Sequence, residues 1–265
     1  GGGLFVVALV AFKIGPAIAL VLVLAVVTAA SLEFFTKLRE LGHAPAMPVG
    51  VAATAGMVLG AYHAGPYGAV VGMGLATVFT MLWFLSGSGE ESEHGVVHNM
   101  GLTLLATAWV GLLGSFAGAL LGIQAGSNQP GIGILLGAII GTIGYDVGGL
   151  FIGRSAGRSP LSEASPNKTI EGLVGGCLVA LLLCVGYGMF VEPLGSPLDG
   201  AKLGIAVAIA APLGDLCQSM IRRDLGIKDM GALIPGHGGL LDRFDGLLFV
   251  LPAVYFVARL SDAFL

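Results

Sequence analysis

Long apolar runs occupy almost the whole of this 265-residue chain. A helix that crosses a bilayer needs about 20 mostly apolar residues. Runs of this kind cover eight stretches, at 16–36, 47–62, 66–86, 100–123, 131–151, 171–190, 202–222 and 246–261. The run 4–14 is a shorter ninth candidate, and Pro16 marks a break after it. We read it as a membrane segment rather than a signal peptide, because no basic residues precede it and further apolar runs follow.

The chain carries too few charged residues to cover a water-facing surface. Hydrophobic residues make up 55% of the sequence and charged residues 11%, whereas soluble domains carry about 25% charged residues. Lipid-facing helices can be apolar on all sides. The composition therefore predicts an all-α polytopic membrane protein with eight or nine transmembrane helices. We expect one integral membrane domain over residues 1–265, in which the helices of about 1–95 form a scaffold and those of about 131–265 carry the active site.

Basic residues gather in alternate loops. Together with Arg222 at an edge, the loops 37–46, 87–99, 152–170 and 223–245 hold nine of the twelve lysine and arginine residues. These nine are Lys37, Arg39, Arg154, Arg158, Lys168, Arg222, Arg223, Lys228 and Arg243. The positive-inside rule places this side in the cytoplasm, so we expect a multi-pass protein of the cell (inner) membrane with a cytoplasmic active site. The net charge of −4 and the lack of a basic tract argue against nucleic acid as a partner.

One of these loops, 87–99, is acidic instead. It contains Glu90, Glu91 and Glu93 together with His94 and His98. A solvated connector is the favoured interpretation of this loop, and a metal site is the less favoured alternative.

Charged residues concentrate between Ser219 and Asp245, and one more acid precedes this segment. Asp215, Ser219 and Arg222 have the spacing i, i+4, i+7 and share one helix face. Asp215 lies about 10 Å from the cytoplasmic end of its predicted helix. An ionised carboxylate at that depth is costly unless it is paired or binds a cation. An ion pair with Arg222 or Arg243 is the structural alternative to a cation site.

Asp242 and Asp245 open the last predicted helix at spacing i, i+3. Helix capping would explain them structurally. Three acids that converge on one place instead suggest a cation site, and oxygen ligands near phosphate chemistry favour Mg²⁺. Asp215, Asp242 and Asp245 are therefore the predicted metal ligands.

A glycine-rich stretch, Pro235 to Gly239, lies between the charged parts of this segment. Such a loop can bring backbone N–H groups close to phosphate oxygens, although a plain interhelical turn is the alternative. Nearby cations could clamp phosphates; they are Arg222, Arg223, Lys228 and Arg243. Acids, cations and this loop together indicate phosphoryl or nucleotidyl transfer on a membrane substrate.

A second polar stretch covers 144–176. It contains Asp146 in a predicted helix, and Thr169 or Ser165 could cap the helix that follows. Lys168 at that helix start is unfavourable for the helix dipole, which hints at an anionic ligand. A capped cytoplasmic loop is the alternative interpretation.

The segment from Ser219 to Asp245 resembles the signature of the phosphatidate cytidylyltransferases, also called CDP-diacylglycerol synthases. The positions that match in spacing are Ser219, Arg223, Lys228, Asp229, Gly231, Pro235, His237, Gly238, Gly239, Asp242, Arg243 and Asp245. Arg222 stands where the family usually has lysine. The stretch from Ser165 to Gly172 and Asp146 with its glycine-rich surroundings also resemble the family, and Glu33 to Gly42 resembles a weaker feature of it.

The resemblance implies that CTP and phosphatidic acid react to CDP-diacylglycerol and pyrophosphate. It implies catalytic roles for Asp215, Asp242, Asp245, Lys228 and Arg243, with the three acids as metal ligands. The implied substrate-binding residues are Asp146, Lys168, Thr169, Ser219, Arg222, Arg223, Asp229, His237, Gly238 and Gly239. Asp146 and Asp229 are weaker candidates for the metal. The expected cofactor is Mg²⁺, either alone or with a second cation, which could be monovalent.

Other functions fit the sequence less well. A related transferase could use another lipid phosphate, such as an archaeal ether lipid, and a CTP-dependent polyprenol kinase is a further alternative. A transporter or channel would place polar residues at the bilayer midplane of paired helices, whereas here they gather at one end. The expected partners are CTP, phosphatidic acid and the lipid bilayer, and a homodimer is compatible with the 45 glycines of the chain.

Overall fold

The computed structural model describes residues 11–88, 93–123, 130–162, 165–191, 194–231 and 238–260. Nearly all of them are helical, which confirms the all-α prediction. The chain divides into two compact units. We call Gly1–Ile123 with Asp229–Arg243 the N-terminal unit, and Gln124–Lys228 with Phe244–Leu265 the C-terminal unit.

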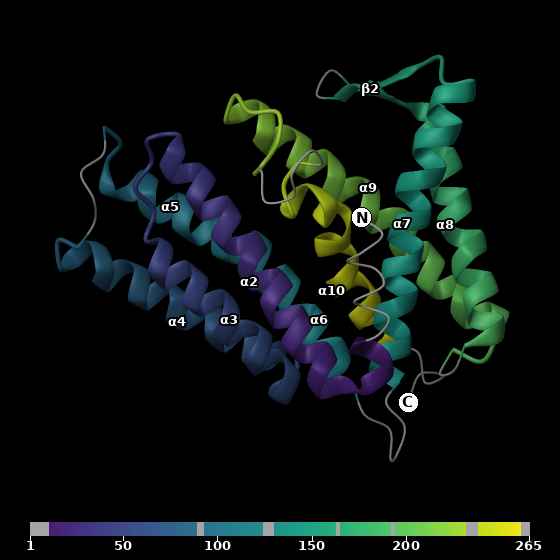
Figure 1. The fold of residues 1–265 in the computed structure, drawn as a ribbon, viewed down its shortest axis with the longest axis horizontal. Helices are drawn as coiled ribbons and strands as arrows, with labels where there is room; N and C mark the ends of the chain where they lie inside the picture. Colours follow the sequence, from purple (N-terminus) through teal and green to yellow (C-terminus); the bar gives the residue numbers. More distant parts are fainter. Residues whose placement is uncertain are drawn as a thin grey trace. The chain divides into compact units, whose positions relative to one another are not determined.

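The N-terminal unit is a bundle of helices (Figure 1). Its helices are α2 (Pro16–Glu40), α3 (Met47–Ala64), α4 (Pro66–Leu85), α5 (Val96–Ala106) and α6 (Leu113–Leu121), with a π-helical stretch, Thr107–Leu112, between the last two. Proline stands in the first turn of α2, α3 and α4, where its missing N–H costs no hydrogen bond. Gly60 and Gly68 let α3 and α4 touch, since a Cβ on Gly68 would lie 2.1 Å from the Gly60 carbonyl oxygen.

In the C-terminal unit, α7, α8 and α9 pack side by side (Figure 1). The elements of this unit are α7 (Pro130–Ala156), β1 (Pro160–Ser162), β2 (Ser165–Thr169), α8 (Ile170–Phe190), α9 (Pro197–Asp224) and α10 (Asp245–Leu260). Glycines again allow close contact: a Cβ on Gly200 of α9 would lie 2.4 Å from the carbonyl oxygen of Cys184 in α8. A short 3₁₀ turn, Leu241–Arg243, precedes α10 in sequence.

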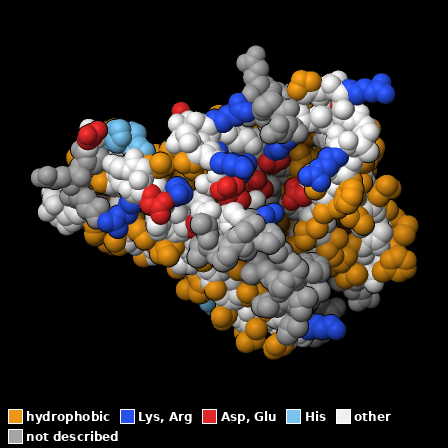
Figure 2. Space-filling model, turned by 45° about the horizontal axis from the view of Figure 1, so that its top comes forward, with side chains coloured by type: hydrophobic (Ala, Val, Ile, Leu, Met, Phe, Trp, Pro, Cys, Tyr) orange, Lys and Arg blue, Asp and Glu red, His pale blue; other side chains and the backbone are white. Residues whose placement is uncertain are grey.

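Among the described residues, six helical stretches are long and apolar enough to cross a membrane: Pro16–Glu40, Pro66–Leu85, Val96–Leu121, Pro130–Ala156, Ile170–Phe190 and Pro197–Asp224. Large apolar side chains such as Phe79, Phe151 and Leu182 are exposed on them, and hydrophobic side chains cover broad areas of the surface in Figure 2. Exposed apolar surface of this extent suits lipid. The chain is therefore a multi-pass α-helical membrane protein.

Two of the eight predicted spans, 47–62 and 246–261, are not among the six stretches. They correspond to α3, which has 18 residues, and to α10, which has 16. Most of the ninth candidate span, 4–14, lies outside the described residues. Its described part, 11–14, is helical. The predicted break after it is confirmed, because α2 begins at Pro16 and Gly15 has a φ of 138°.

The stretch 152–170 differs from the predicted loop. α7 continues to Ala156, and β1 and β2 form a two-stranded antiparallel hairpin before α8. The side chain of Glu171 in α8 accepts hydrogen bonds from the backbone N–H groups of Arg158 and Ser159, at 3.1 and 3.3 Å. These contacts tie the approach to the hairpin to the start of α8. A hairpin this short has little sequence pattern of its own, so its pairing was not visible in the sequence.

Candidate functional site

A pocket of about 410 Å³ lies in the C-terminal unit, beside the hairpin. Its lining comes from one face of α7, the first turn of α8, the hairpin and α9. The polar residues that line it are Tyr145, Asp146, Arg154, Lys168, Thr169 and Asp215. In a largely apolar chain, a pocket with two bases and two acids is suited to a charged ligand.

Glycines bring α7 and α8 together at this pocket. A Cβ on Gly172 would lie 2.9 Å from the carbonyl oxygen of Gly149 and 3.1 Å from the Cα of Gly153. All three glycines line the pocket. Larger residues here would separate the two helices or fill the space between their side chains.

Lys168 and Asp215 form an ion pair in the pocket wall. Lys168 lies on β2 and Asp215 on α9, and their side chains are 30% and 16% exposed. The sequence predicted that the depth of Asp215 requires a partner or a cation, and gave an ion pair with Arg222 or Arg243 as the structural alternative. The structure shows Lys168 as a partner of Asp215, a base that the sequence analysis did not name for this role. The pair also places the Asp215 carboxylate beside Lys168, whose positive charge is unfavourable for the helix dipole at the start of α8.

Thr169 caps α8, as predicted. Its Oγ1 accepts a hydrogen bond from the backbone N–H of Gly172 at 3.1 Å. Because Thr169 follows Lys168 directly and lines the pocket, the cap fixes the backbone that carries the lysine.

The predicted polar face of α9 continues beyond Asp215. The hydroxyl of Ser219 accepts a hydrogen bond from Nη2 of Arg222 at 3.5 Å, and Ser219 is buried. Arg222 is half-buried, whereas Arg223 and Lys228 are exposed. The face thus presents an acid, a hydroxyl and a guanidinium in the order predicted from their spacing.

Asp245 lies where α9 and α10 touch. A Cβ on Gly214 would lie 2.6 Å from the Asp245 carbonyl oxygen and 3.0 Å from the Cα of Gly246. The carboxylate of Asp245 accepts a hydrogen bond from the N–H of Gly246 at 2.7 Å. Asp215 follows Gly214 directly, and its carboxylate interacts electrostatically with that of Asp245. Carboxylate oxygens are the ligands that Mg²⁺ prefers, so this donor set fits the predicted cation.

Asp242 belongs to the N-terminal unit, where it closes a backbone loop. Its Oδ2 accepts hydrogen bonds from the N–H groups of Met230 and Gly239, at 2.8 and 3.0 Å. Gly238 has a φ of 81°, and a Cβ there would lie 3.5 Å from Oδ1 of Asp229 and 3.6 Å from Oδ2 of Asp242. The structural role considered for Asp242 was helix capping; the observed role is to clamp the two ends of a loop.

Glu33 is the residue of this region to which the sequence assigned no role. It is buried on α2, and its Oε2 accepts a hydrogen bond from the N–H of Leu241 at 2.9 Å. A Cβ on Gly231 or Gly239 would lie 2.2 or 2.8 Å from the Glu33 carboxylate. A lone glutamate within the apolar run 16–36 was the available signal. Glu33 and Asp242 thus hold the same segment, which we call the clamped loop (Asp229–Arg243).

The structure distributes the predicted site residues over the two units. Asp146, Lys168, Thr169 and Asp215 share the pocket of the C-terminal unit. In the N-terminal unit, Asp229, Gly238, Gly239, Asp242 and Arg243 lie on the clamped loop, with Asp229 and Arg243 exposed. His237 and Pro235 lie outside the described residues.

Known proteins resemble this chain over nearly its full length. The model of the cytidylyltransferase family matches residues 1–261. A phosphatidate cytidylyltransferase of Mycobacterium leprae (strain TN) is 34% identical over 264 residues, which cover 93% of this chain and 80% of the relative. One of Mycobacterium bovis is 33% identical over 269 residues, 97% of this chain and 85% of the relative. One of Bacillus subtilis (strain 168) is 37% identical over 134 residues, half of each chain.

Proposed function

The chain belongs to the cytidylyltransferase family, and we propose that it transfers the cytidylyl group of CTP to phosphatidic acid, giving CDP-diacylglycerol and pyrophosphate. The relatives named for this activity align with most of the chain. The observation that carries the proposal is the pocket around Lys168 and Asp215, which offers charged groups in a membrane chain of this family.

The proposed reaction joins two anions. A phosphate oxygen of phosphatidic acid attacks the α-phosphorus of CTP, a new P–O bond forms, and the bond to the β-phosphate oxygen breaks, so that pyrophosphate leaves. Cationic side chains reduce the repulsion between the substrates. We assign this role to Lys168 in the pocket and to Arg222, Arg223, Lys228 and Arg243. The lipid phosphate is itself the nucleophile, so no covalent enzyme intermediate is required.

The proposed cation ligands are Asp215, Asp242 and Asp245. Their oxygen donors suit Mg²⁺, and a bound divalent cation would neutralise phosphate charge and favour departure of pyrophosphate. A second cation, which could be monovalent, is compatible with three carboxylates. Asp146 and Asp229 are weaker candidates for the same role.

The remaining predicted residues are assigned to substrate contacts. Ser219 and His237 would contact the nucleotide or the cation, and Gly238 and Gly239 would bring backbone N–H groups near phosphate oxygens. The positive-inside pattern supports an active site at the cytoplasmic face of the cell membrane. The acyl chains remain in lipid, so the proposed site opens to the bilayer as well as to water.

A two-label assay tests the reaction. Purified protein in detergent receives phosphatidic acid, Mg²⁺ and CTP labelled at either the α- or the γ-phosphate, and the lipid phase is counted. We expect α-label in the lipid, γ-label in released pyrophosphate, and neither without phosphatidic acid. Label from the γ-position in the lipid would instead identify a kinase, and no lipid label from folded protein would contradict the proposal.

Substrate arms refine the assignment. Replacing phosphatidic acid with an ether-linked phosphate lipid or with a polyprenol tests the two alternative transferase hypotheses. We expect the diacyl lipid to give the highest initial rate. A higher rate with the ether lipid would identify that lipid as the preferred substrate.

A further inference from the structure

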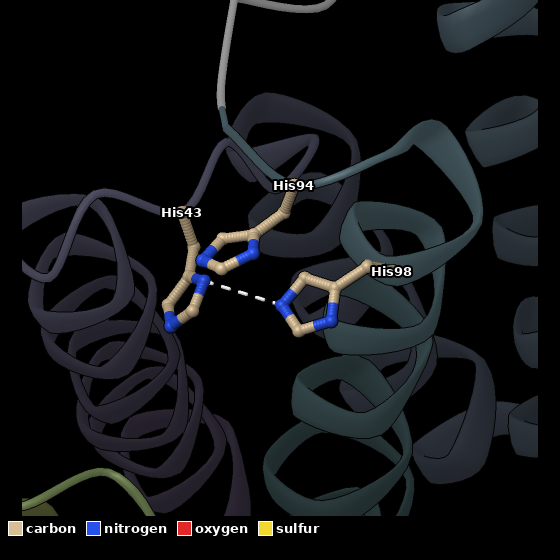
Figure 3. Close-up of side chains that lie close together, drawn as sticks. All are labelled: His43, His94 and His98. Atoms are coloured by element: carbon tan, nitrogen blue, oxygen red, sulfur yellow. Dashed lines mark hydrogen bonds between the residues drawn. The ribbon is translucent and has the colours of Figure 1, made fainter.

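Three histidines from two separate connections meet in the N-terminal unit (Figure 3). His43 lies between α2 and α3, His94 precedes α5, and His98 lies in the first turn of α5. One ring nitrogen of each lies within 4.8 Å of the others. The sequence showed only His94 and His98 in an acidic loop, for which a solvated connector was favoured. His43, distant in sequence, is the residue that changes this interpretation.

Buried hydrogen bonds hold the backbone of both connections in place. Asn99 is buried, and its Oδ1 accepts a hydrogen bond from the N–H of Ala44 at 2.9 Å, next to His43. Its Nδ2 donates to the carbonyl oxygen of His94 at 3.2 Å. Two residues beyond Ala44, the N–H of Ala46 donates to Thr103 Oγ1 at 2.9 Å. The three histidines are therefore placed by fixed backbone and not by chance contact of free loops.

The rings already have spacings close to those of a coordination site. Nε2 of His98 and Nδ1 of His43 are 3.2 Å apart. In a tetrahedral zinc site with Zn–N bonds of about 2.0–2.1 Å, ligand nitrogens are roughly 3.4 Å apart. The ring of His94 is stacked on His43, with centroids 4.7 Å apart, and its centroid is 4.5 Å from that of His98. His94 and His98 are exposed, so their side chains can rotate toward a common point with His43.

We propose that His43, His94 and His98 form a binding site for a divalent transition-metal ion of the Zn²⁺ type, with water in the remaining position. Imidazole suits Zn²⁺, whereas Mg²⁺ takes oxygen ligands. The site is thus chemically distinct from the carboxylates proposed for cytidylyl transfer. The metal joins the α2–α3 and α4–α5 connections, so its role is to stabilise the N-terminal unit.

Metal analysis and calorimetry test the site. Full-length protein without a histidine tag is stripped with EDTA in detergent and titrated with Zn²⁺, and bound metal is counted after desalting. We expect one Zn²⁺ per chain, retained in excess Mg²⁺. His43→Ala, His94→Ala and His98→Ala should each weaken binding at least tenfold. His63→Ala is the matched control, because His63 is also exposed in this unit but lies outside the cluster.

Stability and spectra give independent readouts. Zn²⁺ should raise the Tm of the wild type and of His63→Ala, but not of the triple His→Ala variant, and Co²⁺ should give the visible absorption of a tetrahedral site. CTP-dependent labelling of lipid should persist in the triple variant, which shows that it folds. Equal Zn²⁺ affinity of wild type and triple variant, or binding only at millimolar Zn²⁺, would overturn the proposal and leave the cytidylyl transfer untouched.

Discussion

The two parts of α9 each carry a carboxylate paired with a lysine, but the two pairs are built differently. Near the start of the helix, Asp199 contacts Lys202 at 2.9 Å and accepts a hydrogen bond from Ser196 at 2.6 Å. All of these partners lie within one helical turn. Further along, Asp215 pairs with Lys168 from β2, at the wall of a pocket.

The difference shows how to separate a structural acid from a functional one. Both side chains are largely buried, with 8% of Asp199 and 16% of Asp215 exposed. Local partners and a capping serine explain Asp199 completely as a helix start. Asp215 needs a partner from another element, and the same arrangement creates a charged pocket. Both carboxylates are buried, so burial does not distinguish them. What distinguishes a functional acid is that its partner comes from another secondary-structure element.

The largest expected effect is therefore the contrast between Asp215→Asn and Asp199→Asn. We expect Asp215→Asn to lower the initial rate of lipid labelling on the order of 100-fold or more, because a negatively charged ligand of the proposed cation is lost. Asp199→Asn should keep most of the activity and instead lower the Tm. Equal losses of rate in the two variants would remove Asp215 from the proposed site.

Asp242 extends the comparison to an acid that combines a structural and a proposed catalytic role. Asn at this position keeps an oxygen that can accept from Met230 and Gly239, whereas Ala does not. We expect both variants to lose activity on the order of 100-fold, since both lose the charge proposed to hold a cation. Only Asp242→Ala should also lose about 1–3 kcal/mol of stability, from the unsatisfied N–H groups. Initial rates and urea unfolding measure the two effects, and a fully active Asp242→Asn would reduce the residue to a loop clamp.

Glu33 should act through the clamped loop alone. Glu33→Gln keeps an acceptor for the N–H of Leu241, while Glu33→Ala leaves that group unpaired. We expect Ala to cost about 1–3 kcal/mol of stability and to raise the KM for CTP, with Gln restoring most of both. Thermal unfolding and substrate titration provide the measurements. Identical behaviour of Gln and Ala would show that the hydrogen bond to Leu241 is not what matters.

Sequence alone predicted what depends on local periodicity and missed what depends on pairing between distant segments. The helices follow from apolar runs, and the Thr169 cap and the Ser219–Arg222 face follow from short spacing. Asp215 was recognised as needing a partner, but a base on another element could not be selected from spacing. For the same reason the hairpin, the contact of Glu33 with the clamped loop and the approach of His43 to α5 required the structure.

The smallest expected effect compares two helix caps, Thr169 at α8 and Ser196 at α9. Each side chain accepts a hydrogen bond at 3.1 Å from a backbone N–H three residues later. Replacing either with Ala should cost about 1 kcal/mol of stability. Thr169 also holds the backbone beside Lys168, so Thr169→Ala should raise the KM for CTP, while Ser196→Ala leaves it unchanged.

Thr169→Ser separates the cap from the rest of the side chain, because it keeps the hydroxyl and removes only the methyl group. It should restore both stability and KM. If Ser196→Ala raised the KM as much as Thr169→Ala, the kinetic change would report general loosening of the C-terminal unit rather than placement of Lys168. An increase in KM confined to Thr169→Ala would instead show that affinity for CTP depends on the backbone segment that carries the Thr169 cap and Lys168, the partner of Asp215.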